Sequence, residues 1–265
     1  MSRLRLRPEG LPRRGAAPPA RLAAGRHPVT DSEAVHPLPK LHHVELWRAD
    51  LDAVSPATLH PLLSDEELQR LSRLRHPLVR QRALASRALL RLLLARYLDR
   101  PAATLPLISG PQGKPALALA TPLRFNLSHS ANLFVCGVTV EREIGVDIER
   151  VRDKRDLAAI TERFFAPDEA TWLRQRSAAE RCEAFYRLWC RKEALIKGDG
   201  RGFALPSNSF SVIRDDEPAT TVQFADAGTW RITNVDVDLF PTTCTAVALA
   251  RDETFSTSLY DLIAG

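Results

Sequence analysis

Residues 133–149 read LFVCGVTVEREIGVDIE, and this stretch constrains the fold more than any other part of the chain. LFVCGVTV is an uninterrupted apolar run with the length of a buried strand. A short polar turn separates it from a second apolar run, IGVDIE. The stretch therefore predicts two consecutive strands, each with at least one face in the core.

The second of these strands carries two carboxylates. Asp147 and Glu149 are two residues apart, so on a strand their side chains project from the same face, with Cα atoms ~6.6 Å apart. Neighbouring carboxylates repel each other unless they are protonated or a cation lies between them, and oxygen-only ligation favours Mg²⁺ over zinc. The alternative is two solvated acids, each paired with Arg142 or Arg150. The spacing by itself leaves both open.

The helix predicted to contain residues 189–197, WCRKEALIK, places charge on its apolar side. With Phe185 at 0° and steps of 100° per residue, the apolar side chains fall between about −80° and +100°. Lys192 falls near −20°, Glu193 near +80° and Lys197 near +120°, at the edge of the arc, by the same count. The charged residues expected on the opposite side are Glu183, Arg187 and Arg191.

Glu193 and Lys197 are four residues apart and could be an ordinary surface ion pair, worth about 0.3–0.5 kcal/mol. On the apolar side of a helix, however, such charges would be desolvated, and desolvated charges persist when they are paired, bound to metal or functional. The simplest arrangement has Glu193 meeting Asp147 and Glu149 around a magnesium ion, with Lys197 facing an anion such as pyrophosphate.

Two further motifs offer phosphate donors. FNLSHS places Ser128, His129 and Ser130 at the end of a strand, where a hydroxyl and an imidazole can donate to phosphate oxygens. A Ser-His hydrolase is excluded, because no GxSxG turn surrounds Ser128 and adjacent residues cannot act as nucleophile and base. GPQGKP, with Lys114, is too short for a Walker loop. It is either a ligand loop or a plain turn.

Three regions follow along the chain. Residues 1–40 carry many prolines and arginines without hydrophobic periodicity, and we expect a disordered arm. Residues 41–143 and 144–265 each mix helices with alternating strands, and we expect an α+β fold of two halves. Capping boxes, Ser-x-x-Glu, predict helices beginning after Ser64 and Ser177.

Composition narrows the class of protein. The four cysteines form no CxxC pair, which argues against a disulfide framework or a zinc site and favours the cytoplasm. The longest helical apolar stretch, LLRLLLARYL, is interrupted by Arg91 and Arg96, so no membrane span is expected. The net charge of +5 fits an anionic ligand or an acidic partner protein. It is a less specific indication of nucleic-acid binding.

Five motifs in this order, GKP, FNLSHS, GVDIE, RFFAPDE and WCRKEALIK, resemble the Sfp-type 4'-phosphopantetheinyl transferase family over residues from about 63 to 212. The resemblance implies a holo-[carrier protein] synthase that transfers the phosphopantetheine of coenzyme A to a serine of an apo acyl or peptidyl carrier protein. It implies Mg²⁺ dependence, release of 3',5'-ADP, and a monomer. It also implies two halves related by a pseudo-twofold axis, each with helices on an antiparallel sheet, and an active site between them.

The resemblance also implies roles for individual residues. The implied metal ligands are Asp147, Glu149 and Glu193, with Glu193 also handling the serine proton. The implied contacts to coenzyme A are Arg82, Lys114, Ser128, His129 and Lys197, of which Lys197 faces the pyrophosphate. Where some relatives carry a basic residue and a threonine for the 3'-phosphate, this chain has Glu67 and Ala83, so Arg70 and Arg82 would have to serve.

Two rival functions are open on the sequence. A non-catalytic binder of nucleic acid or another anionic polymer would use the arginines of helix 78–98 and the basic arm, with steep salt dependence. Such a binder would not explain why Asp147, Glu149 and Glu193 should converge. A magnesium phosphohydrolase acting on nucleotides would release product without any acceptor protein.

Overall fold

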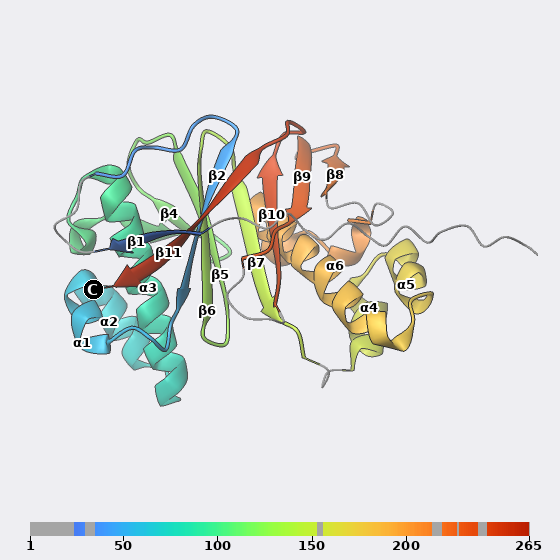
Figure 1. Cartoon of the computed structure of the whole chain (residues 1–265), viewed down its shortest axis with the longest axis horizontal. Coiled ribbons are helices and arrows are strands. Elements are labelled where there is room, and N and C mark those ends of the chain that lie inside the picture. Colours follow the sequence, from blue (N-terminus) through green and yellow to red (C-terminus); the bar gives the residue numbers. More distant parts are fainter. Residues whose placement is uncertain are drawn as a thin grey trace, which may run out of the picture.

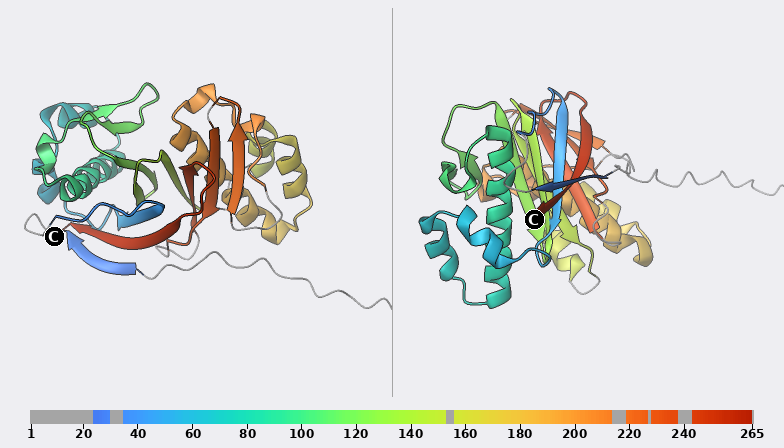
Figure 2. Two further views of the ribbon diagram at one scale, coloured as in Figure 1. Left: turned by 90° about the horizontal axis from the view of Figure 1, so that it is seen from above. Right: turned by 60° about the vertical axis from the view of Figure 1, so that its left-hand side comes forward.

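The computed structural model describes residues 24–29, 35–152, 156–213, 219–226, 228–237 and 243–264. Helices lie on the two outer sides of the molecule and the sheets lie between them (Figures 1 and 2). The helices are α1 Pro56–Leu59, α2 Asp65–Ser72, α3 Pro77–Leu98, α4 Leu157–Phe164, α5 Pro167–Arg174 and α6 Ala178–Asp199. The strands are β1 Ala24–Val29, β2 His43–Asp50, β3 Leu107–Ser109, β4 Pro115–Leu117, β5 Leu123–Ser130, β6 Leu133–Val140, β7 Ile144–Arg150, β8 Ala219–Phe224, β9 Gly228–Asn234, β10 Thr243–Ala250 and β11 Ser256–Ala264.

The strands form two main sheets and one small hairpin. The first sheet has the order β1-β11-β2-β6-β5, the second has the order β7-β10-β9-β8, and β3 pairs with β4. The two strands predicted from residues 133–149 are present, and the turn between them is the point where the chain passes from the first sheet to the second. Helices combined with antiparallel pairing confirm the α+β class.

The first sheet is mixed, so the expectation of a purely antiparallel sheet in each half is wrong there. Strand β11 runs parallel to both β1 and β2. Hairpin neighbours must be antiparallel, but β2 and β11 are joined through the whole second sheet, and so long a connection permits a parallel pair. The predicted C-terminal half, 144–265, thus supplies one strand to the sheet of the N-terminal half.

The disordered arm expected for residues 1–40 is wrong at Ala24–Val29, which form β1. This strand pairs with β11 in parallel register from Ala24 with Leu259 to Val29 with Ala264. Pairing at a sheet edge uses backbone groups, so it does not require the hydrophobic alternation that AGRHPV lacks. Residues 1–23 and 30–34 lie outside the described residues.

Both predicted capping boxes are confirmed, at the starts of α2 and α6. At α2 the acidic member, Glu67, also accepts from Arg87 and Arg91 of α3. Arg91 is only 2% exposed and its Nη1 donates to the Ala102 carbonyl over 2.6 Å. Arg91 is therefore not available to an anionic polymer, because it holds two helices and a loop together.

Helix α6 packs against the second sheet at a point where no side chain fits between them. A Cβ atom placed on Gly145 of β7 would lie 1.8 Å from the Ala194 carbonyl oxygen and 2.4 Å from the Gly198 nitrogen. Gly198 in turn lies under the ring of Trp230. This close approach fixes how near the last turn of α6 comes to β7.

Gly145→Ala should destabilise the protein by about 1–3 kcal/mol, because the added methyl group must push α6 away from β7. Thermal unfolding should then occur roughly 3–10 °C lower. A melting temperature equal to that of the wild type would show that a methyl group fits between Gly145 and the backbone of α6.

All four cysteines lie among the described residues and are free thiols, which confirms the prediction of no disulfide framework. Within the described part of the chain, none of the helices has the length and apolar character that crossing a membrane requires.

Candidate active site

The candidate site lies where the two sheets meet, between β5 of the first and β7 of the second (Figure 1). The Oδ1 atom of Asn126, which is 3% exposed, accepts a hydrogen bond of 2.9 Å from the backbone nitrogen of Val146. This bond sets β5 and β7 side by side, and it places Ser128 two residues on along β5 opposite Asp147.

Ser128, Asp147 and Lys197 form the centre of the site. The Ser128 hydroxyl donates to Asp147 Oδ1 over 2.9 Å. The Lys197 ammonium, on the last turn of α6, donates to the same oxygen over 2.6 Å and to Ser128 Oγ over 2.8 Å. Asp147 is 4% exposed and the Lys197 side chain is 31% exposed, so the carboxylate is withdrawn from water while the lysine stays partly accessible.

Glu149 and Glu193 lie around this centre. The half-buried Glu149 accepts from the Ser130 hydroxyl over 2.7 Å. Burial raises the pKa of Glu193, the charges of Asp147 and Glu149 raise it further, and Lys197 opposes them. The three predicted metal-binding carboxylates are thus close enough to repel one another.

Asp147 offers one carboxylate oxygen to a further ligand. Its Oδ2 atom is buried and has no hydrogen-bond partner among the described residues. A buried carboxylate oxygen without a partner is costly, and a cation would satisfy it. In this arrangement, however, no three His, Cys, Asp or Glu side chains of the described chain are gathered closely enough to hold a metal ion. Lys197 supplies the positive charge beside Asp147 instead.

His129 is exposed, next to Ser128 on β5. Desolvation by the surrounding protein lowers its pKa, and the charge of Lys197 lowers it further. The imidazole is therefore held toward its neutral form, in which one ring nitrogen donates and the other accepts.

Lys114 lies at a separate pocket of about 580 Å³ beside the C-terminal end of α6. Its ammonium donates to the carboxylate of Glu143 over 2.9 Å and to the Gly198 carbonyl over 2.9 Å. The loop that carries it, residues 110–114, also meets the second half at Gly202, where an added Cβ would contact Gln112. The GKP loop is thus more than a plain turn, because it bridges the two halves one residue beyond Lys197.

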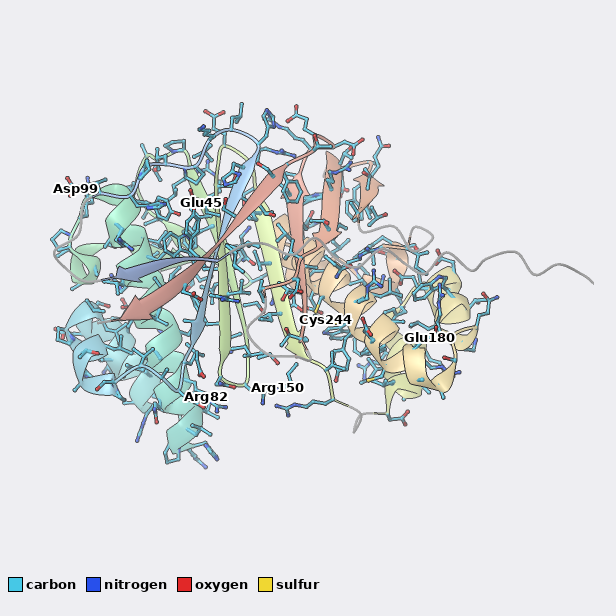
Figure 3. All side chains as sticks on the ribbon, in the orientation of Figure 1. Glu45, Arg82, Asp99, Arg150, Glu180 and Cys244 are labelled. Carbon is cyan, nitrogen blue, oxygen red and sulfur yellow. The ribbon has the colours of Figure 1, made fainter. Side chains whose placement is uncertain are left out.

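Arg82 is not brought to these residues. It lies on α3, toward the lower edge of the molecule in Figure 3. It forms a bidentate ion pair with Asp52, with Nε 2.8 Å from Oδ1 and Nη2 2.6 Å from Oδ2. Arg70, the other arginine considered for the 3'-phosphate, pairs with Glu66 on its own helix.

Lys192, which falls within the apolar arc of α6, pairs with an acid outside the cluster of Asp147, Glu149 and Glu193. Its ammonium, 1% exposed, pairs with Glu169 of α5 over 2.6 Å and donates to the carbonyls of Ser207 and Phe210. It ties α6 to α5 and to the segment that follows the helix.

Arg191, expected on the outer side of α6, is 4% exposed and donates to Asn234 of β9. The helix is covered on two sides, by the second sheet and by α4, α5 and residues 202–213, so one apolar arc could not describe both faces.

Sequence reasoning missed Asn126, Glu143 and Gly145. Asn126 lies in the quoted FNLSHS motif, where a polar residue on an otherwise apolar strand was a usable signal. The role of Gly145 depends on a helix 50 residues further on, which the sequence alone does not place.

Two family models match the chain. Residues 47–141 match the N-terminal region of 4'-phosphopantetheinyl transferases, and residues 143–248 match the 4'-phosphopantetheinyl transferase superfamily. The boundary between the matches falls at the turn where the chain passes from β6 to β7.

Three relatives are similar to much of the chain. The slr0495 protein of Synechocystis sp., whose naming as a 4'-phosphopantetheinyl transferase is provisional, is 36% identical over 72% of this chain and 78% of its own length. The 4'-phosphopantetheinyl transferase HetI of Nostoc sp. is 36% identical over 66% of this chain and 76% of its own. The transferase Sfp of Bacillus subtilis is 29% identical over 62% of this chain and 72% of its own. The chain thus belongs to the Sfp-type 4'-phosphopantetheinyl transferase family and is an enzyme of that class.

Proposed function

We propose that this enzyme transfers the 4'-phosphopantetheine of coenzyme A to a serine of an apo carrier protein, with Mg²⁺, and releases 3',5'-ADP. Family membership supports the transfer. The observation that carries the rest is the buried Asp147, one oxygen of which is held by Ser128 and Lys197 while the other has no described partner.

Asp147, Glu149 and Glu193 would hold the magnesium ion. To do so, the three side chains would have to converge from their described positions. The unpartnered Asp147 oxygen favours this, as do the burial and the neighbouring negative charges that raise the pKa of Glu193. Bound there, the ion would supply positive charge against the negative charge that develops on the leaving 3',5'-ADP.

Lys197 is the proposed pyrophosphate contact. Its ammonium has three hydrogens, of which two are directed to Asp147 and Ser128. The third can donate to a phosphate oxygen without breaking either bond. The position of Lys197 is fixed by the close packing of α6 on Gly145.

Glu193 is the proposed acceptor of the serine proton, directly or through one water molecule. Without a metal ion the pKa of Glu193 is raised, first by burial and then by the charge of Asp147, and a bound magnesium ion would lower it again. The proposed role therefore rests on the position of Glu193 beside Asp147 and Glu149. Its half-buried position on α6 keeps part of the side chain accessible to an incoming serine.

The remaining contacts to coenzyme A are proposed at Ser128, His129, Lys114 and Arg82. Lys114 already lines a pocket, and His129 lies on the rim of the site. Arg82 would have to release Asp52 before it could meet a phosphate, so we expect it to contribute least.

We propose further that residues 41–143 and 144–265 are pseudo-twofold-related halves with the active site at their interface. The meeting of β5 with β7 and α6 supports an interfacial site. The expected partner is an acidic carrier domain rather than nucleic acid or a membrane, and the expected state is a cytoplasmic monomer.

The formation of 3',5'-ADP from coenzyme A tests the proposal against its rivals. With Mg²⁺, product should form only when an apo carrier domain is present, in proportion to the carrier added. Product without a carrier would indicate the phosphohydrolase, and no product with several different carriers would favour the anionic-polymer binder.

A further inference from the structure

Glu143 forms ion pairs with two cationic side chains, Lys114 and Arg124, at the edge of the pocket beside α6. Lys114 Nζ lies 2.9 Å from Glu143 Oε2, and Arg124 Nε lies 3.2 Å from Glu143 Oε1. All three residues line the pocket of about 580 Å³. One carboxylate group therefore occupies the point on which two positive charges converge.

Both cations also donate to backbone carbonyls. Lys114 Nζ also donates to the carbonyls of Ile144 and Gly198. Arg124 Nη1 donates to the carbonyls of Thr121 and Leu123, each over 2.9 Å. Three of these carbonyls belong to β5, β7 and the end of α6, and the fourth, that of Thr121, lies two residues before β5, so all four are fixed by the backbone around the pocket. They hold the two cations in place whether or not a ligand is present.

The Glu143 side chain, in contrast, is free to move. It is 52% exposed, whereas its backbone is fixed by a hydrogen bond of 2.9 Å from Ala250 nitrogen to its carbonyl. Rotation about its side-chain bonds would carry the carboxylate into solvent without disturbing β7. Exposed ion pairs of this kind are weak, so a more strongly charged anion can replace them.

We propose that Glu143 is an internal placeholder for an anionic phosphate group of the ligand, which displaces its carboxylate from Lys114 and Arg124. This inference rests on the proposed function, which supplies a nucleotide with a phosphomonoester as the ligand. Glu143 thus neutralises the two cations in the free enzyme and weakens ligand binding by competing for them.

The test is the affinity of the enzyme for 3',5'-ADP, measured by calorimetry. Glu143→Gln removes the competing charge but keeps the length of the side chain, so it should bind the nucleotide about threefold to tenfold more tightly than the wild type. The gain in affinity of Glu143→Gln over the wild type should be smaller for adenosine 5'-monophosphate, which lacks the 3'-phosphate. Glu141→Gln is the matched control, since Glu141 is exposed on the same turn and the two ion pairs go to Glu143. It should change the affinity by less than about twofold.

The outcomes separate this inference from the proposed function. Equal affinity of the wild type and Glu143→Gln would overturn the placeholder while leaving the transferase proposal intact. An equal gain in Glu141→Gln would also overturn it, because net charge alone would then explain the effect. If none of the three proteins bound 3',5'-ADP, the proposed substrate class would be wrong and this inference would fail with it. Melting temperatures of the two variants confirm that both are folded.

Discussion

Asp147→Asn should lower the rate of transfer by roughly 10²–10³-fold while leaving the protein folded. Asparagine has the same shape and can still accept from Ser128, but it lacks the charge that pairs with Lys197 and would hold a metal. Because the substitution also removes one of three mutually repelling carboxylates, the melting temperature should change little. Initial rates of holo-carrier formation measure the transfer rate, thermal unfolding measures the melting temperature, and calorimetric titration with Mg²⁺ measures the expected loss of metal binding.

Asp252→Asn is the control for this substitution. Its carboxylate is 61% exposed and lies beyond the site, near Arg231 and Thr221. It should keep both the wild-type rate and the wild-type response to Mg²⁺. Transfer by Asp147→Asn at a rate similar to that of the control would remove Asp147 from the site.

Lys192→Met should destabilise the protein by about 3–5 kcal/mol, because it leaves the Glu169 carboxylate buried without its cation. Glu169 is 0% exposed, and its two oxygens also accept from the backbone nitrogens of Ala166 and Val212. Thermal unfolding should occur roughly 10 °C lower than in the wild type.

The loss should depend on pH. Burial raises the pKa of Glu169, so the folded state binds the proton more readily than the unfolded state does. Stability contributed by this group therefore falls as the pH rises from the unfolded-state pKa toward the folded-state pKa. In Lys192→Met the deficit should shrink on acidification, since a protonated Glu169 needs no cation.

Two variants act as checks on this result. Lys40→Met makes the same change at an exposed lysine and should leave stability within about 0.5 kcal/mol of the wild type. Combining Lys192→Met with Glu169→Gln removes the buried charge and should recover part of the loss. If the single variant Lys192→Met had the melting temperature of the wild type, the buried ion pair would not be what holds α5 to α6.

The local elements were predictable because short-range chemistry determines them. The Ser64–Glu67 and Ser177–Glu180 boxes predicted where two helices begin, and the apolar runs of β6 and β7 predicted two buried strands. The helical periodicity of residues 189–197 correctly placed Lys192 in the core. In each case the residues that determine the structure lie within one or two turns of each other.

Features that depend on residues far apart in the sequence could not be predicted. The pairing of β11 with β2 joins residues more than 200 positions apart, and no local pattern encodes the parallel register. Arg191 looked exposed because the sheet that covers it is built from strands at both ends of the second half. Arg82 looked available for a phosphate because its partner, Asp52, lies 30 residues earlier.

The same limit applies to the site. Residue types and spacing identified the carboxylates of β7 and the lysine of α6, and the structure brings Asp147, Ser128 and Lys197 into direct contact. That Lys197 would pair with the very carboxylate expected to bind metal follows only from the packing of α6 against Gly145.

The intact mass of an apo carrier domain, measured after incubation with this enzyme, coenzyme A and Mg²⁺, tests the central claim most directly. The carrier should gain the mass of one phosphopantetheine group, and the gain should disappear when its acceptor serine is replaced by alanine or when Mg²⁺ is chelated. An unchanged mass across acyl and peptidyl carriers, with folded enzyme and Mg²⁺ present, would contradict it.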